Sequence, residues 1–366
     1  MKDLSLYLHI PFCKTICLYC NFLTFAHKNK FIEQYVEALK KEIEIKAGDF
    51  KNYRIETIYF GGGTPSLIAA EKTEDILITL KKNFRIDENA EINIECNPES
   101  LNLKKLAHYK KMGISRISLG IQSFDKKTLH RLARPHDDQA IFKALEAIRQ
   151  SGFKNYGADF IIGLPYQTLE NFQSQLKQII NLNIPHLSFY FLSYDTNRID
   201  IFKADCPSEE KQLEMYEYLT KKIRQAGYLH YEVSNYAKPG FECRHNLRYW
   251  QQKEYLGLGI GSHSYINEKC IENETDFNTY LDHPLGIHEE VEIDTELQKL
   301  DYIMLQLRTA KGIERRSYEK RFSDYDKLVQ KAATFIASGH LQLQKDALQP
   351  SEKGFLIIDK ITRDLF

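Results

Sequence analysis

Cys13-Lys14-Thr15-Ile16-Cys17-Leu18-Tyr19-Cys20 places three thiols close together, directly after a short apolar stretch near the N-terminus. Cysteine thiolates are the usual ligands of iron–sulfur clusters, and a [4Fe-4S] cluster has four irons to ligate. Three cysteines leave one iron open, and an open coordination position marks a reactive rather than a structural metal site. This stretch therefore predicts a reactive iron–sulfur cluster, and the rest of the chain is interpreted around it.

The spacing of the three cysteines fits a zinc site poorly. Structural zinc sites usually pair cysteines as CxxC and take a second pair or histidines downstream. No second pair follows here, because the remaining cysteines stand singly at Cys96, Cys206, Cys243 and Cys270. Free cysteine is among the most buried residue types, so we expect these four to be core residues. A distorted zinc site or a chance grouping of core thiols is the alternative for the three.

Length, composition and charge limit the number of domains and the kinds of partner and compartment that we expect. With 366 residues and 42.9 kDa, the chain can form a barrel-sized domain and a smaller second one. Lys plus Arg and Asp plus Glu number 50 each, so no net charge favours nucleic acid. No apolar run has the length of a signal peptide or a membrane span. With seven cysteines, an odd number, these features lead us to expect a cytoplasmic protein without a nucleic-acid partner.

Strand-like and helix-like segments alternate through the first half of the chain. The predicted strands are 4–10, 55–60, 91–95, 115–120, 156–162 and 186–192, and the predicted helices between them are 31–45, 73–82, 103–112, 138–150 and 168–182. Such alternation implies right-handed βαβ crossovers and, without a Rossmann signature, favours a curved or barrel-like parallel sheet. In such barrels the active site lies at the C-terminal ends of the strands.

Polar and glycine-rich motifs follow these predicted strands. Gly61-Gly62-Gly63-Thr64-Pro65 comes directly after the second strand, where glycines let the backbone approach a ligand. Glu95, Gln122 and Asp159 lie at or near the ends of the next three strands, and Arg134 can pair with a carboxylate. The alternative for the glycine motif is a tight turn. The alternative for the three polar residues is that they are hydrogen-bonded groups at strand ends, and the alternative for Arg134 is a solvated surface arginine. Together these residues predict a polar rim beside the cysteines.

The second half of the chain is less regular. We predict a helix over 208–227, a strand over 228–236 and a loop carrying the HNLRYW sequence at 245–250. The glycine-rich segment 256–264 suits close contact with a flat ligand or with the barrel mouth. From about residue 294 the composition shifts to charged helices, at 297–307 and 325–338, with 340–344 and 354–358 expected to form a hairpin.

CxxxCxxC resembles the signature of the radical S-adenosylmethionine (SAM) superfamily, in which three cysteines hold a [4Fe-4S] cluster and SAM chelates the fourth iron. The succession FGGGTPS, IECNPE, SLGIQSF, DFIIGLP and HNLRYW resembles, over essentially the whole chain, one branch of it: the oxygen-independent coproporphyrinogen III oxidases and the HemW haem chaperones. The resemblance implies an α/β fold. A partial (β/α)6 barrel with the cluster and SAM sites would span 1–235, a connecting segment with the HNxxYW haem motif 236–293, and a winged-helix-like helical C-terminal domain 294–366.

The resemblance also carries candidate site residues onto this sequence. It implies cluster ligation by Cys13, Cys17 and Cys20. The positions matching SAM contacts are Tyr7, Tyr19, Gly62, Gly63, Thr64, Glu95, Gln122, Arg134 and Asp159, and the haem candidates are His245, Asn246, Tyr249 and Trp250. An imidazole can ligate haem iron and flat aromatics can stack on a porphyrin. The alternative for His245 is a hydrogen-bonded structural residue.

Two functions are compatible with the resemblance. One is a haem chaperone that binds haem, the cluster and SAM and delivers haem to client haemoproteins such as respiratory haem enzymes. The other is an oxygen-independent coproporphyrinogen III oxidase, which converts propionates to vinyl groups. The chaperone is favoured because Phe22 stands where those oxidases carry a fourth cysteine, because only a short segment precedes Cys13, and because HNLRYW is present. The haem motif argues against a radical SAM enzyme acting on another substrate. SAM cleavage, a homodimer and peripheral contact with membrane-bound clients are left open.

Overall fold

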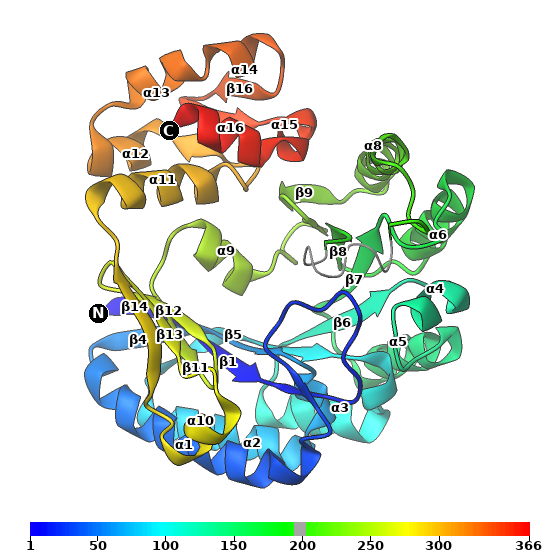
Figure 1. Cartoon of the computed structure of the whole chain (residues 1–366), viewed down its shortest axis with the longest axis vertical. Helices are drawn as coiled ribbons and strands as arrows, with labels where there is room; N and C mark the ends of the chain where they lie inside the picture. Colours follow the sequence, from blue (N-terminus) through cyan, green and yellow to red (C-terminus); the bar gives the residue numbers. More distant parts are fainter. Residues whose placement is uncertain (194–202) are drawn as a thin grey trace.

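A curved twelve-stranded sheet runs through the described part of the chain, residues 1–193 and 203–366 of the computed structural model (Figure 1). Its centre holds parallel strands paired in chain order: β1 (Lys2–Ile10), β4 (Tyr53–Gly62), β5 (Ile86–Cys96), β6 (Arg116–Gln122), β7 (Tyr156–Ile162) and β8 (His186–Phe191). The predicted strand–helix alternation and parallel sheet are confirmed. The sheet does not close on itself among the described strands, so it is a partial barrel.

Amphipathic helices connect these strands and cover one face of the sheet (Figure 1). They are α1 (Ile32–Lys46), α2 (Ala70–Asn83), α3 (Leu103–Met112), α5 (Asp138–Ser151), α6 (Leu169–Asn181) and, after the last parallel strand, α8 (Glu209–Gln225). In α1 the apolar residues Tyr35, Val36, Leu39 and Ile43 recur at helical spacing, and all four are buried. Burying one large apolar side chain stabilises a fold by about 1.5–3 kcal/mol, so this stripe fixes the helix against the sheet.

Later segments extend both edges of the sheet. On one edge, β11 (Tyr255–Leu258) pairs in parallel with β1, and β12 (His263–Ile266), β13 (Lys269–Asn273) and β14 (Ile287–Glu292) follow in antiparallel order. On the other edge, β10 (Asn235–Ala237) and β9 (Leu229–Glu232) follow β8. Residues from the second half of the chain therefore stand directly beside the strand that precedes the cysteines.

Two predictions for the middle of the chain are wrong. The single strand expected over 228–236 is the hairpin of β9 and β10, whose turn at Val233 and Ser234 contains neither glycine nor proline. The loop expected around HNLRYW is the short helix α9 (Arg244–Trp250), which begins without a side-chain cap at Cys243. Neither feature carries the local turn or cap signals on which sequence interpretation depends.

The C-terminal region has an apolar core of its own. Helices α11 (Thr295–Gln306), α12 (Arg315–Phe322), α13 (Tyr325–Lys331), α14 (Ala333–Ala337), α15 (Glu352–Leu356) and α16 (Ile358–Leu365) surround a small sheet of β15 (Ile313–Glu314), β17 (Ala347–Pro350) and β16 (Leu341–Gln344). The expected helix over 325–338 is broken in two at Ala332. The expected strand over 354–358 is helical, because Ser351 caps α15, and β16 pairs with β17 instead.

The C-terminal region lies over α9, which itself lies beside the sheet (Figure 1). Gln306 Nε2 donates a 2.8 Å hydrogen bond to the carbonyl of Trp250, and Arg321 Nη1 donates one of 2.6 Å to Gln252. The remaining short elements are β2 (Phe12–Cys13), β3 (Phe25–Ala26), α4 (Lys126–Arg131), α10 (Phe277–Asp282) and the 3-10 turns Asn29–Phe31, Ala47–Phe50, Pro65–Leu67 and Pro98–Ser100. None of the described helices combines the length and apolar character needed to cross a membrane.

Candidate functional site

A cavity of about 390 Å³ lies at the C-terminal ends of the parallel strands, and we name it the cysteine cavity. Cys13, Cys17 and Cys20 line it. Eight of the nine SAM candidates line it too: Tyr19, Gly62, Gly63, Thr64, Glu95, Gln122, Arg134 and Asp159. These residues come from β4, β5, β6 and β7 and from the loops beside the strands, which the parallel sheet brings together. The structure therefore gathers the cysteines and the polar rim at one place.

The cysteine loop is held against the glycine motif by backbone hydrogen bonds. The N–H of Gly63 donates to the Ile10 carbonyl at 2.9 Å, and that of Thr64 donates to the Phe12 carbonyl at 2.8 Å. Cys13 Sγ lies 3.6 Å from the Thr64 hydroxyl, and burial raises the pKa of the Cys13 thiol to about 11. A neutral thiol is therefore favoured there until a metal displaces its proton.

Glycine is required where β4 meets this loop. A Cβ at residue 63 would lie 2.8 Å from the Phe12 carbonyl oxygen and 3.0 Å from Cys13 Sγ, distances that leave no room for a side chain. Gly62 has φ of +112°, a conformation that side chains resist. The motif thus places backbone directly against the cysteine loop, while the expected approach of this backbone to a ligand stays a prediction.

Asn97 links the glycine motif to Arg134. Its Nδ2 donates to the Thr64 hydroxyl at 3.2 Å, and its Oδ1 accepts from Arg134 Nη2 at 3.0 Å. Arg134 also donates to the Gly120 carbonyl at 2.7 Å, and its Nη1 lies 3.5 Å from Cys17 Sγ. Arg134 is therefore an ordered guanidinium inside the cavity and not a solvated surface residue. Sequence interpretation overlooked Asn97, although it lies within the quoted IECNPE motif.

Two carboxyl groups, Glu95 on β5 and Asp159 on β7, border the cavity. Burial raises the pKa of Glu95 to about 7, against the opposing effect of a 2.8 Å hydrogen bond that it accepts from Tyr59. Burial also raises the pKa of Asp159, while Ser188 opposes the shift. A cationic ligand favours the ionised form of such groups. These carboxyls are suited to receive a positively charged ligand, and perturbed groups of this kind mark functional sites.

The donor set fits an iron–sulfur cluster in chemistry. Three thiols line one cavity, and the buried Nε of Arg134 has no hydrogen-bond partner among the described residues, so a polar atom there awaits a ligand. Within residues 1–193 and 203–366, no three His, Cys, Asp or Glu side chains are already arranged around a common metal-ion position. The residues that would hold a cluster here are Cys13, Cys17 and Cys20.

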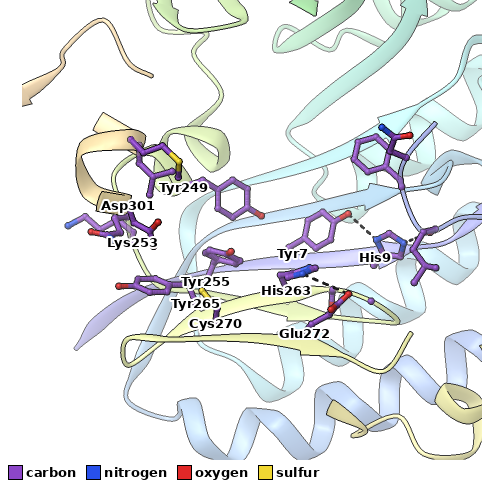
Figure 2. Close-up of a pocket in the computed structure, with 18 residues that line it drawn as sticks. Tyr7, His9, Tyr249, Lys253, Tyr255, His263, Tyr265, Cys270, Glu272 and Asp301 are labelled. Atoms are coloured by element: carbon purple, nitrogen blue, oxygen red, sulfur yellow. Dashed lines mark hydrogen bonds and ion pairs between the residues drawn. The ribbon is translucent and has the colours of Figure 1, made fainter. Parts of the chain in front are cut away.

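Tyr7 departs from the expected SAM positions, because it lines a second cavity of about 600 Å³. We name this the tyrosine cavity, after the rings of Tyr7, Tyr249, Tyr255 and Tyr265 that line it (Figure 2). The hydroxyl of Tyr7 lies 3.1 Å from His9 Nδ1, and His9 Nε2 lies 2.8 Å from the Leu23 carbonyl. Sequence interpretation did not find this cavity, whose walls come from both halves of the chain.

His245 is a buried, fully engaged histidine. Its Nδ1 lies 2.7 Å from the Thr57 hydroxyl and its Nε2 lies 2.9 Å from the hydroxyl of Tyr249, while its ring stacks on Tyr59 at 4.9 Å. Burial lowers its pKa to about 3, so the imidazole is neutral. Both ring nitrogens are occupied, and neither described cavity is lined by this side chain. This geometry matches the structural alternative for His245.

The other three haem candidates differ in whether they line one of the two cavities. Tyr249 lines the tyrosine cavity, with its ring edge-on to Tyr255 at 4.6 Å. Asn246 and Trp250 line neither the cysteine cavity nor the tyrosine cavity. Trp250 instead lies beside Glu232, whose pKa burial raises to about 7. Of the four candidates, only Tyr249 reaches a cavity wall in either place.

Comparisons with known proteins agree with this geometry. The family model described as "Radical SAM superfamily" matches residues 7–179. Proteins named "Heme chaperone HemW" are similar over almost the whole chain. That of Lactococcus lactis subsp. lactis is 31% identical, covering 97% of this chain and 95% of its own length, and that of Haemophilus influenzae is 32% identical, covering 99% and 97%.

A solved structure is similar over the full length. It is the coproporphyrinogen III oxidase (HemN) from Escherichia coli, described as a radical SAM enzyme, with a TM-score of 0.87, 25% sequence identity, and coverage of 100% of this chain and 90% of that one. Both the partial barrel and the C-terminal region are therefore shared. Taken together, the family match, the HemW relatives and this structural similarity show that the chain belongs to the radical SAM superfamily and, within it, to the HemW family.

Proposed function

We propose that this protein is a haem chaperone of the radical SAM type. It binds a [4Fe-4S] cluster through Cys13, Cys17 and Cys20, holds SAM in the cysteine cavity, and delivers haem to client haemoproteins such as respiratory haem enzymes. The chaperone function is supported by its relatives, which are named haem chaperones. The net charge of zero supports protein clients over nucleic acid.

One observation carries the cluster and SAM part of the proposal. Three cysteines and eight SAM candidates, far apart in the sequence, line a single cavity at the C-terminal ends of the strands. SAM carries an ammonium, a sulfonium and a carboxylate. Glu95 and Asp159 offer carboxyls for the cationic groups, and Arg134 offers a guanidinium for the carboxylate. The cavity therefore has the charges that this ligand needs.

The chemistry divides between the cluster and the chain. When bound, a reduced cluster supplies an electron to SAM. The chain's own residues position the ligand: Gly62 and Gly63 allow close backbone approach, and Asn97 fixes Thr64 relative to Arg134. Tyr19 also lines the cavity, and an aromatic ring beside a bound cluster would limit the access of water. Formation of 5′-deoxyadenosine, which is measured in the experiment below, distinguishes cleavage of SAM from a role of SAM in ordering the site.

The second candidate function is that of an oxygen-independent coproporphyrinogen III oxidase. The full-length similarity to the E. coli oxidase favours it, as does the arrangement of the SAM candidates. Phe22 argues against it, because it stands where the resembling oxidases carry a fourth cysteine. The Phe22 side chain is 72% exposed and lines both cavities. The apolar ring of Phe22 is suited to contact an apolar ligand in these cavities.

The deciding experiment is an anaerobic incubation of cluster-reconstituted protein with SAM, reductant and coproporphyrinogen III, analysed by mass spectrometry. Formation of 5′-deoxyadenosine is followed in parallel, and a characterised oxidase serves as the positive control. We expect no decarboxylated porphyrinogen from protein whose cluster is intact and whose SAM is bound. Detection of the decarboxylated product at the rate of the control enzyme would establish the oxidase function instead.

Delivery is tested separately by mixing haem-loaded protein with an apo-haemoprotein and following the client's own haem spectrum. We expect haem to pass to the client faster than it dissociates into buffer containing albumin. We place this activity in the cytoplasm, with peripheral contact to membrane-bound clients. A homodimer is part of the proposal, to be checked by light scattering of the haem-loaded protein.

A further inference from the structure

We propose that haem binds in the tyrosine cavity and that His263 is the side chain that ligates its iron. The proposal rests on the proposed function, because it names the place on this chain where the haem cargo is held. It also gives His245, the histidine of the HNxxYW motif, a positioning role in place of a ligating one.

The tyrosine cavity has the size and the walls that a flat macrocycle needs. Its volume of about 600 Å³ falls within the range of about 300–1,000 Å³ that is typical of small-molecule sites. Aromatic rings from four elements border it: Tyr7 on β1, Tyr249 on α9, Tyr255 on β11 and Tyr265 on β12 (Figure 2). Flat rings of this kind can stack on or pack edge-on to a porphyrin.

Three histidines lie at or beside this cavity, and two of them are already engaged. His9 has partners on both ring nitrogens, Tyr7 and the Leu23 carbonyl. His245 has Thr57 and Tyr249. The ring of His263 makes no hydrogen bond to any described residue, and its side chain is 61% exposed. Haem iron is commonly held by a histidine, so the histidine with open nitrogens is the one suited to ligation.

The surroundings of His263 support that role. Glu272 faces it across the β12–β13 pair, with Oε1 3.9 Å from His263 Nε2. Metal-ligating histidines usually direct their second ring N–H at a carboxylate or carbonyl, which orients the ring. Cys270 and Met304 also line the cavity and carry sulfur donors. Burial raises the pKa of the Cys270 thiol, which makes it a poorer ligand than a neutral imidazole.

The charged groups of the cavity favour one orientation of haem. Lys253 is exposed and lies with Asp301 at the end away from His9 and His263 (Figure 2). A haem propionate can pair with the Lys253 ammonium at this mouth, while the iron faces His263. Burial raises the pKa of Asp301, which lessens its repulsion of a propionate.

The position of the cavity fits a protein that combines haem with a cluster. Asn21 and Phe22, which directly follow the last cysteine of the motif, line the tyrosine cavity and the cysteine cavity alike. Haem in the tyrosine cavity would therefore contact the loop that holds the cluster. This shared wall gives the two ligands a direct physical connection.

The test is a haem titration followed by absorption and resonance Raman spectra of the ligated iron, using full-length His263→Ala. We expect the spectrum of histidine ligation to be lost and haem affinity to fall by about tenfold or more, since even changes around a ligand cost about tenfold. His288→Ala, which removes an exposed histidine on β14, two strands from β12 in the same sheet, is the matched control and should behave as wild type.

The second variant separates ligation from positioning. His245→Ala removes the partner of the Tyr249 hydroxyl, so we expect weaker haem binding with the wild-type ligation spectrum retained. An unchanged spectrum in His263→Ala, or its loss only in His245→Ala or Cys270→Ser, would overturn the assignment of His263. Failure of the wild-type protein to bind haem at all would contradict the proposed function itself, before the site is in question.

Discussion

Nε2 of His245 lies 2.9 Å from the hydroxyl oxygen of Tyr249, one turn further along α9. The other ring nitrogen of His245 lies 2.7 Å from the Thr57 hydroxyl on β4. The histidine of the HNxxYW motif thus fixes a tyrosine of the cavity wall to the central sheet. In the haem site proposed above, the motif would contribute through Tyr249, while His245 is buried and does not line the tyrosine cavity.

The burial of His245 predicts a loss of stability in acid. Its pKa is about 3 in the folded protein, against about 6.5 in an unfolded chain. As the pH falls below about 6.5, the unfolded chain binds a proton that the folded protein does not bind until about pH 3. We therefore expect the wild type to lose about 2 kcal/mol from this group between pH 7.5 and pH 5.

The measurement compares urea unfolding of the wild type and His245→Gln at the two pH values. Other buried histidines, such as His9 and His230 with pKa values lowered by burial to about 4, titrate in both proteins and cancel in the difference. An equal pH dependence of the two proteins would show that folding does not lower the pKa of His245.

Gly63→Ala is predicted to lower the iron and sulfide content. Its added Cβ would lie 2.8 Å from the Phe12 carbonyl oxygen and 3.0 Å from Cys13 Sγ, so the cysteine loop must move. We expect less than half of the wild-type iron after identical anaerobic reconstitution. Gly48→Ala is the control, because nothing lies within 4 Å of the position of its added Cβ. Full cluster content in Gly63→Ala would show that the loop does not need this close approach.

Replacing Cys13, Cys17 or Cys20 with alanine is predicted to abolish the cluster in each case. The three thiols line one cavity, and the loss of one leaves two ligands for four irons. Iron, sulfide and the absorption spectrum of the reconstituted protein measure the effect, with Cys206→Ala as a cysteine control outside the motif. Retention of full iron and sulfide in all three variants would refute the cluster assignment.

Much of the fold could be predicted because it depends on local patterns. The strands and helices of the first half follow from apolar periodicity, and the rim of Glu95, Gln122 and Asp159 follows from the rule that parallel strands end together. The hairpin turn at Val233 and Ser234 was missed because it contains neither glycine nor proline. An explicit signal could also be misread: Ser351 caps α15, yet the segment that follows it was expected to be a strand.

The tyrosine cavity and the surroundings of His245 could not be predicted, because they depend on contacts between segments that are distant in the sequence, which local patterns do not encode. Tyr7 borders the tyrosine cavity because β1 pairs with β11, with Tyr7 opposite Gly257. His245 is engaged because Thr57, 188 residues away, lies against it. Strand alternation shows that Tyr7 lies in a strand but not which segment covers it. The haem candidates were for this reason predicted as a motif, and their separate places could be assigned only in the folded chain.

The pKa of Glu95 predicts how SAM binding depends on pH. Burial raises this pKa to about 7, and the cationic groups of SAM favour the ionised carboxylate. Below pH 7 a proton must leave Glu95 before the ligand binds, so we expect affinity to weaken by up to about tenfold per pH unit below 7 and to level off above it. Calorimetric titration of anaerobic, cluster-reconstituted protein at pH 6 and pH 8 measures the difference.

Two variants make this measurement specific to Glu95. Glu95→Gln should bind SAM more weakly than the wild type at pH 8 and should lose most of the pH dependence, because no proton remains to be displaced. Glu99 also lines the cavity, but its pKa lies below the usual range because, although burial opposes the shift, the hydrogen bond with His136 lowers it. Glu99→Gln should therefore keep the wild-type slope between pH 6 and pH 8. If the slope persists in Glu95→Gln and disappears in Glu99→Gln, the cationic end of SAM is received by the Glu99 side of the cavity, and Glu95 has only a structural role with Tyr59.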